Sequence, residues 1–188
     1  MSVAAIFAGG KSSRMGKDKA LLPFGGHTTL AAFQYTKLKR YFDAVYLSAK
    51  EDKFDFDAPT IADQYSTHSP LSGLITLFET LPDEEIFILS VDAPFVDQAV
   101  IEKILNHAKY TKGDAIIAQT PSGLQPLCGL YRRSILPLAK AQLEKDNHKM
   151  QDLLALAKSM VVLFEEESDF ANLNHPQEYD EALKSFKI

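Results

Sequence analysis

The amino terminus of this chain is a short apolar run followed at once by a basic, glycine-rich loop. Val3–Phe7 reads VAAIF, and the twelve residues after it read AGGKSSRMGKDK. A buried strand that ends in such a loop brings backbone N–H groups, lysines and an arginine to one point in space. Phosphate oxygens bind to groups of this kind. The pattern therefore predicts a first strand that leads into a phosphate-binding site.

The loop differs from two well-known phosphate loops. Gly10-Lys11-Ser12 is similar to the end of a Walker A motif, but that motif requires a glycine where this chain has Ala5. A dinucleotide fingerprint requires the spacing G-x-G-x-x-G, whereas Gly9 and Gly10 are adjacent. The sequence therefore excludes both motifs and leaves another kind of nucleotide loop.

The charge of this loop opposes that of the whole chain. Residues 11–19 hold four cations and one anion, while the formal net charge of the chain is −5. A local reversal of this kind is expected of a polyanion site on an acidic surface. A solvated surface loop is the alternative reading of the same composition. The acidic balance argues against general nucleic-acid binding.

The size of the chain predicts a single domain over residues 1–188. With 188 residues, 46% of them hydrophobic, the chain is long enough for one core and short for two. The single cysteine, Cys128, cannot form an internal disulfide, and no apolar run is long enough for a secretory signal or a membrane span. We expect a cytoplasmic protein without a membrane partner.

Short β-rich runs alternate with longer helical patterns, which favours a mostly parallel sheet covered by helices. The predicted strands are Val3–Phe7, Ala44–Ser48, Thr60–Ala62, Ile86–Val91, Ala115–Gln119, Leu127–Tyr131 and Met160–Phe164. The predicted helices are Thr29–Leu38, Pro70–Leu81, Asp97–Lys109, Ser134–Lys145, Met150–Lys158 and Gln177–Phe186. Pro70 suits a first helical turn, and Asp97 suits a helix cap.

The run from Ala8 to Lys19, A-G-G-x-S-x-R-M-G-x-D-K, resembles the molybdenum cofactor guanylyltransferases, a branch of the MobA-like nucleotidyltransferases. The resemblance implies a Rossmann-like three-layer α/β sandwich of the nucleotide-diphospho-sugar transferase type. It also implies that the strand end and glycine turn bind the nucleotide, and that Lys19 contacts its phosphates. The residues of that turn are Phe7, Ala8, Gly9 and Gly10.

Asp92 is the leading candidate for a metal ligand. It follows the predicted strand Ile86–Val91 and precedes Pro94 by two residues. In open α/β sheets, ligands bind at the carboxyl ends of the strands, and Mg²⁺ prefers one or two carboxylates together with phosphate oxygens. A cap for the next helix is the alternative, but Asp97 already fills that position. The segment also resembles the D-x-P motif of the family, whose aspartate holds the metal.

Two further residues follow predicted strands and are candidates for nucleotide contacts. A carboxylate at Asp63 can accept hydrogen bonds from both N1–H and N2–H of guanine, and the resemblance implies this role. A surface-turn aspartate is the alternative. Ser48 stands where the family has an asparagine. The segment Ser69–Gly73 is similar to the family motif G-P-L-x-G.

Two later segments match the family with departures. Gln125, in LQPLCGLY, stands in place of a histidine on the pterin side of the cleft, so it cannot act there as a cation. The segment NLNHP is similar to N-x-N-T-P, with His175 in place of threonine. Asn172 and Asn174 either order the cleft or contact the pterin substrate, or, as the alternative, cap the last helix.

The resemblance implies transfer of GMP from GTP to molybdenum-loaded molybdopterin, with Mg²⁺ as cofactor and pyrophosphate as leaving group. Arg14, Lys19 and Asp92 are the predicted catalytic residues. It also implies handover of the product to a molybdoenzyme or a chaperone. The alternatives are a nucleotidyltransferase for another acceptor, such as a cytidylyl or sugar-phosphate enzyme, and a non-catalytic GTP-binding adaptor subunit.

Overall fold

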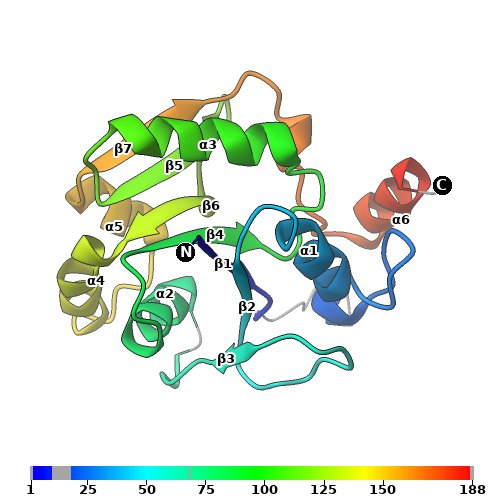
Figure 1. Ribbon diagram of the computed structural model, residues 1–188, viewed down its shortest axis with the longest axis horizontal. Coiled ribbons are helices and arrows are strands. Elements are labelled where there is room, and N and C mark those ends of the chain that lie inside the picture. The colour runs from blue at the N-terminus through cyan, green and yellow to red at the C-terminus, as the bar shows by residue number, and fades with distance from the viewer. Residues whose placement is uncertain (1, 10–17, 68, 187–188) are drawn as a thin grey trace.

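A seven-stranded sheet forms the centre of the molecule (Figure 1). The computed structural model describes residues 2–9, 18–67 and 69–186. The strand order is β3-β2-β1-β4-β6-β5-β7, and every pairing is parallel except those of β6 with β4 and β5. The strands are β1 (Val3–Phe7), β2 (Ala44–Ala49), β3 (Thr60–Ala62), β4 (Glu85–Ser90), β5 (Ala115–Thr120), β6 (Gly123–Arg132) and β7 (Ser159–Leu163).

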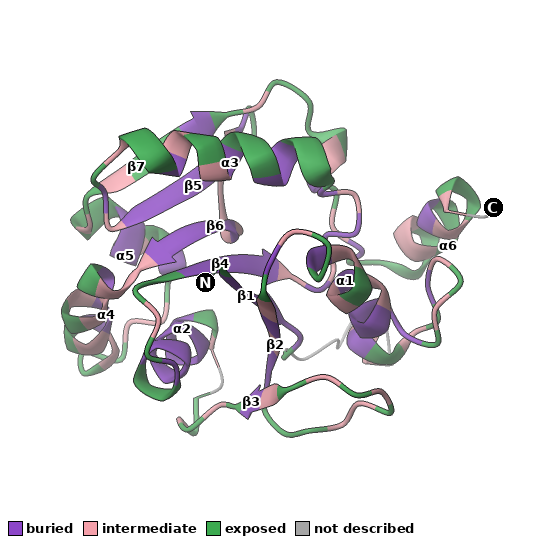
Figure 2. Ribbon diagram, viewed as in Figure 1, coloured by how far each residue is buried: buried purple, intermediate pink, exposed green. Residues whose placement is uncertain are grey.

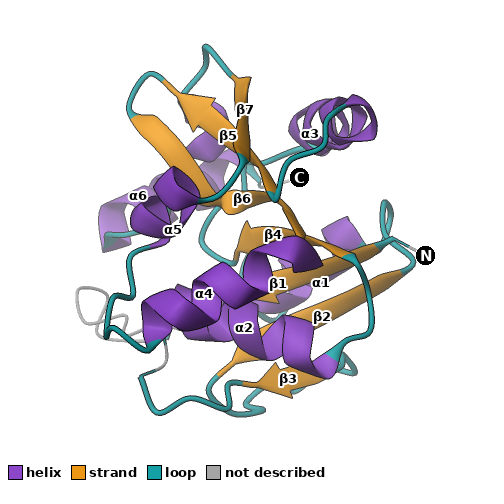
Figure 3. Ribbon diagram, turned by 90° about the vertical axis from the view of Figure 1, so that its left-hand side faces the viewer, coloured by secondary structure: helices purple, strands orange, loops and turns teal. Residues whose placement is uncertain are grey.

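Helices cover both faces of the sheet, so the predicted three-layer α/β class is confirmed. One core packs beneath α1 (Leu30–Leu38), α3 (Gln98–Tyr110) and α6 (Pro176–Ser185). The other packs beneath α2 (Pro70–Thr80), α4 (Leu136–Leu143) and α5 (Met150–Leu156), and Figure 3 shows α2 and α4 in front of the sheet. Three short 3₁₀ turns cover Lys19–Leu21, Arg133–Ile135 and Ser168–Phe170.

The first strand shows why two cores form. Ala4 and Ile6 belong to the core under α1, whereas Val3, Ala5 and Phe7 belong to the core under α2. Successive side chains of a strand point to opposite faces, so a strand that is apolar at every position must be covered on both sides. Figure 2 shows the central strands buried and the outer surfaces of the helices exposed.

The helix starts follow the sequence signals. Asp97 Oδ1 accepts a hydrogen bond from Val100 N at 3.0 Å, and Ser69 Oγ accepts from Ser72 N at 3.2 Å. Pro70 lies in the first turn of α2, where a missing N–H costs nothing. Both predicted starts are confirmed to within a residue.

The predicted bounds of two elements differ most from those in the structure. The strand expected over Leu127–Tyr131 extends from Gly123 to Arg132, because β5 and β6 form a hairpin with a register shift. Pro126 lies at that shift, and its missing N–H interrupts the pairing with β5. The helix expected over Ser134–Lys145 is shortened to Leu136–Leu143 by the preceding 3₁₀ turn.

The helices are short. The α3 helix has 13 residues, against the roughly 20 that a membrane-spanning helix needs. Within the described parts of the chain, no helix has both the length and the apolar composition to cross a bilayer.

Candidate active site

The sheet has a switch point between β1 and β4. From β1 the chain proceeds to β2 and β3 on one side, and β4 begins the other half of the sheet. Crevices for ligands form outside the carboxyl ends of strands at such a point. The residues that follow β1, β2, β3 and β4 meet at this edge. Val91 N donates to Phe7 O at 3.0 Å, and Ala8 N donates to Ser48 O at 2.9 Å, so the strand ends are joined there.

The larger cavity at this edge has a volume of about 710 Å³. Four of the predicted nucleotide-binding residues line it together, namely Phe7, Gly9, Ser48 and Asp63. The start of α2 also contributes to the wall, through Ser69, Pro70 and Gly73. The structure therefore brings together residues from three strand ends and one helix start, as the sequence predicted.

A smaller cavity of about 210 Å³ lies beside it and contains Asp92. Gln125 and Asn172 also line this cavity. Ser90 and Leu127 belong to the walls of both cavities. The two cavities thus meet at the end of β4, with Asp63 in one and Asp92 in the other.

Asp92 is the centre of a polar network. Lys19 Nζ lies 2.8 Å from Asp92 Oδ2, and Ser90 Oγ donates to Asp92 Oδ1 at 2.6 Å. Lys19 Nζ also donates to Asn174 Oδ1 at 3.1 Å. The side chains of Lys19 and Asp92 are 15% and 19% exposed, so their attraction is less screened than that of a surface pair. Two predicted catalytic residues are therefore in direct contact.

The same network decides between the two readings of the late asparagines. The residue that caps α6 is His175, and the carboxylate of Glu178 accepts hydrogen bonds from His175 N and Asn174 N. The Asn174 side chain binds Lys19 instead, and Asn172 lines the smaller cavity. Both asparagines thus belong to the cleft rather than to a helix cap.

Asp63 is a positioned carboxylate rather than a mobile surface one. Ser72 Oγ donates to its Oδ2 at 2.8 Å, while Thr76 Oγ1 and Tyr65 N donate to its Oδ1 at 3.2 and 3.0 Å. The first two donors lie on α2, whose start forms the cavity wall. A carboxylate held in this way keeps a fixed orientation toward the cavity.

Lys53 is a cleft residue that the sequence analysis missed. Its Nζ donates to Ala8 O at 3.0 Å and forms an ion pair with Asp18, and it lines the larger cavity. It lies in the mixed-charge stretch between β2 and β3, which carries no recognisable motif. Lys53 thereby connects Ala8, at the start of the glycine loop, to Asp18, near its end.

The glycine loop itself is described only at its ends. Gly10 and Arg14, two predicted site residues, lie outside the described residues. The N–H of Ala8 is engaged by Ser48, so this amide is not available to a phosphate, contrary to our expectation. A Cβ added at Gly9 would lie 3.6 Å from Ala49 Cα, an ordinary contact. Packing within the protein therefore does not require a glycine at position 9.

The donor set near Asp92 fits Mg²⁺. The described residues contain no group of three or more His, Cys, Asp or Glu side chains that could hold a metal by themselves. Mg²⁺ commonly takes one or two carboxylates and completes its shell with phosphate oxygens and water. Asp92, which lines the smaller cavity beside the shared residue Ser90, offers a hard oxygen donor of this type.

A mostly parallel sheet of this order, with one reversed strand and a cleft at the switch point, places the protein in the three-layer α/β class. Its fold matches that of molybdopterin-guanine dinucleotide biosynthesis protein A from Archaeoglobus fulgidus, with a TM-score of 0.82, 18% identity and 97% of each chain covered.

The chain belongs to the MobA-like NTP transferase family, whose domain matches residues 4–161. It is 38% identical over 184 residues to a molybdenum cofactor guanylyltransferase from Campylobacter jejuni. The match covers 97% of this chain and 95% of the relative. A protein of the same name from Helicobacter pylori is 31% identical over 188 residues, covering 97% and 92%.

Proposed function

We propose that this protein transfers GMP from GTP to the phosphate of molybdenum-loaded molybdopterin, forming the guanine dinucleotide cofactor and pyrophosphate. The observation that carries the proposal is the contact of Lys19 with Asp92, whose carboxylate lines the smaller cavity and is bonded to Ser90, a residue of both cavities. The names of the relatives support GTP as donor and the molybdenum cofactor as acceptor. The same proposal places the reaction in the cytoplasm, in keeping with a single, buried free cysteine.

The two cavities suggest a division of labour. The larger one suits GTP, because Asp63 presents a fixed carboxylate to the N1–H and N2–H donors of guanine. Its volume of about 710 Å³ is in the range of small-molecule sites. The smaller one, with Gln125 and Asn172, suits the acceptor. The α-phosphate then lies near their junction, beside Asp92.

In the proposed reaction, an oxygen of the acceptor phosphate forms a bond to the α-phosphorus of GTP. The bond from that phosphorus to the β-phosphate oxygen breaks, and pyrophosphate leaves on the opposite side. The protein orients the two phosphates in line and stabilises the charge on the leaving group. Lys19 supplies a cation at that point, and Arg14 is proposed as a second one. No covalent enzyme intermediate is needed.

Asp92 is proposed to hold Mg²⁺ when the nucleotide is bound. The ion supplies positive charge to the phosphate oxygens. Ser90 holds Asp92 Oδ1 by a 2.6 Å hydrogen bond and so restricts the orientation of the carboxylate. The ammonium group of Lys19, at 2.8 Å from Oδ2, balances the negative charge of the carboxylate before the ion binds.

Titration calorimetry with GTP, ATP and CTP in the presence of Mg²⁺, followed by a pyrophosphate assay with molybdopterin, tests the proposal. Preferential binding of GTP and release of pyrophosphate on addition of the acceptor are expected. Transfer from CTP, or transfer to a sugar phosphate, would indicate another nucleotidyltransferase. GTP binding without pyrophosphate release would indicate a non-catalytic adaptor. In the proposed role, the product passes to a molybdoenzyme or its chaperone.

A further inference from the structure

The loop that carries Asp92 has almost no secondary structure to hold it. It connects β4, which ends at Ser90, to α3, which begins at Gln98. Val91, Ala93 and Val96 are 7%, 5% and 0% exposed, so the loop is buried although it lies at the cleft. Backbone carbonyls in such a loop need hydrogen-bond partners from elsewhere in the molecule.

Side chains of α1 supply most of those partners. Gln34 Nε2 donates to Val91 O at 3.1 Å and to Ser90 O at 3.4 Å. Lys37 Nζ donates to Val96 O at 2.7 Å and to Pro94 O at 3.1 Å. The two side chains are three residues apart on a helix and therefore lie on one face. They hold the loop on both sides of Asp92.

The carbonyl of Asp92 itself is held from the other direction. Leu173 N donates to Asp92 O at 2.9 Å, next to Asn174, which binds Lys19. The backbone at Asp92 is thus fixed between α1 and the segment before α6. Figure 1 shows α1 on the same side of the sheet as α6, with the connection from β4 to α3 passing beside α1.

The two side chains that hold the loop, Gln34 and Lys37, are unusual on the buried face of a helix. Gln34 is completely buried, and its Oε1 has no hydrogen-bond partner among the described residues. A buried amide with an unsatisfied oxygen costs stability, and an apolar side chain would avoid that cost. Burial also lowers the pKa of the Lys37 amine to about 7, against the opposing influence of Cys128 and Asp97. Stability of the core alone does not account for either residue.

We propose that Gln34 and Lys37 are positioning residues for catalysis, which fix the backbone on both sides of Asp92 so that its carboxylate is oriented toward the metal and the α-phosphate. This inference rests on the proposed function. Neither residue lines the larger or the smaller cavity, so neither touches the substrates. Their effect is expected on metal binding and on turnover rather than on the affinity for GTP.

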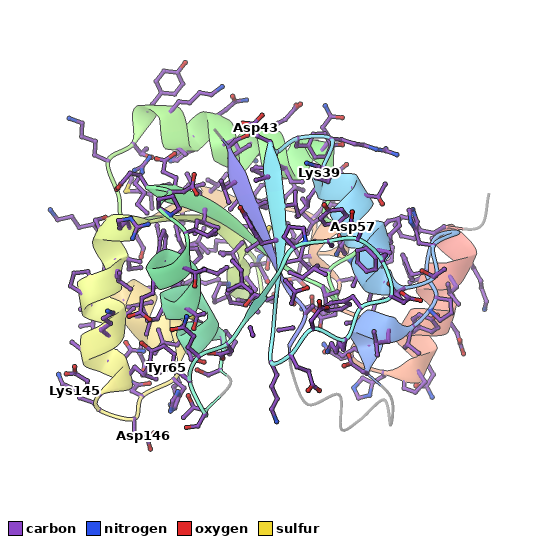
Figure 4. All side chains as sticks on the ribbon, turned by 60° about the horizontal axis from the view of Figure 1, so that its bottom comes forward. Lys39, Asp43, Asp57, Tyr65, Lys145 and Asp146 are labelled. Carbon is purple, nitrogen blue, oxygen red and sulfur yellow. The ribbon has the colours of Figure 1, made fainter. Side chains whose placement is uncertain are left out.

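The test uses the full chain with Lys37→Met and Gln34→Met, which remove the donors while keeping the length of the side chain. Lys39→Met is the matched control, because Lys39 lies at the end of the same helix, donates to Asp43 O and lines neither cavity; Figure 4 labels both residues. Mn²⁺ binding, measured by electron paramagnetic resonance with a non-hydrolysable GTP analogue, is expected to weaken about tenfold in both test variants. The kcat is expected to fall about 10- to 100-fold with the KM for GTP near wild type.

A second measurement needs neither metal nor substrate. Amide hydrogen exchange in residues 91–96 is expected to accelerate in Lys37→Met and Gln34→Met and to stay unchanged in Lys39→Met. Lys37→Arg, which keeps N–H donors, is expected to restore part of the Mn²⁺ affinity. If Lys37→Met fails to fold, Gln34→Met carries the test alone.

Wild-type kcat, Mn²⁺ affinity and loop exchange in Lys37→Met and Gln34→Met would overturn the inference, as would equal losses in Lys39→Met. A wild-type protein that transfers no GMP would overturn the proposed function instead. In that case, unchanged exchange in the loop would overturn the positioning role as well, whereas faster exchange would support the structural part of it.

Discussion

Lys19 Nζ lies 2.8 Å from Asp92 Oδ2, although the two residues are 73 positions apart in the chain. The pair joins the end of the glycine loop to the end of β4, and Lys19 extends the link to Asn174. The ammonium group of Lys19 thus links three segments of the chain: the end of the glycine loop, the loop after β4 and the segment before α6. The contact couples the loop that is proposed to hold phosphates to the carboxylate that is proposed to hold Mg²⁺.

Replacement of Asp92 is expected to abolish transfer while the fold persists. Asp92→Asn keeps the shape of the side chain and removes the charge that the metal needs, so kcat should fall on the order of 10²-fold or more. Radiolabelled GMP transfer at a series of Mg²⁺ concentrations measures the effect. Asp55→Asn, at an exposed position that lines neither cavity, is the control. Near wild-type activity of Asp92→Asn would reject the metal assignment.

The contact between Lys19 and Asp92 should appear as an energetic coupling. Residues in one ion-pair network give non-additive changes, commonly 0.5–3 kcal/mol. The free energies of unfolding of Lys19→Met, Asp92→Asn and the double variant form the required cycle, measured by urea denaturation without nucleotide. The double variant is expected to be more stable than the sum of the single losses predicts. If the losses of the two single variants add up to that of the double variant, the ion pair does not contribute to the free energy of unfolding.

Asp63 is expected to select guanine through its 2-amino group. Inosine triphosphate lacks that group, so the wild-type kcat/KM should favour GTP over it by about 10- to 100-fold, the value of a hydrogen bond to a charged acceptor. In Asp63→Asn the preference should shrink to a few-fold. Asp57→Asn, at an exposed position labelled in Figure 4, provides the comparison. An undiminished preference in Asp63→Asn would place base recognition elsewhere.

Lys37 is expected to make stability depend on pH above neutrality. Its pKa is about 7 in the folded protein and 10.5 for an ordinary lysine, so between these values the unfolded chain binds the extra proton. The free energy of unfolding should therefore rise with pH across this window, by up to about 1.4 kcal/mol per pH unit. Urea denaturation of wild type and Lys37→Met at pH 7 to 9 should show this slope only in the wild type. Equal slopes would mean that the folded amine titrates as an ordinary lysine does.

The sequence was sufficient to predict the helices and strands whose bounds depend on residues close together in the chain. The apolar run Val3–Phe7, the Asp97 cap and Pro70 in the first turn of α2 each act within a few residues, and the structure confirms them. The candidate residues at strand ends were also predictable, because a parallel sheet brings the ends of its strands to one edge. Ser48 and Asp63 meet in one cavity for this reason.

The residues that support the site were not predictable in the same way. Gln34 and Lys37 read as ordinary helix positions, and their partners lie more than fifty residues later in the chain. Lys53 likewise acquires its role only through contact with Ala8 and Asp18. The extent of β6 was missed because its pairing with β5 depends on a hairpin register that Pro126 interrupts. Each of these features arises from tertiary contacts rather than from a local pattern.

The reversed direction of β6 has a consequence for the choice of acceptor. Because that strand runs against its neighbours, its early residues, Gln125 to Leu127, reach the same rim as the late residues of β4. The wall that we propose to face the acceptor is therefore built from a hairpin whose turn, at Ser122, does not line the larger cavity. We therefore expect changes in this hairpin to alter the choice of acceptor while the proposed nucleotide site stays the same.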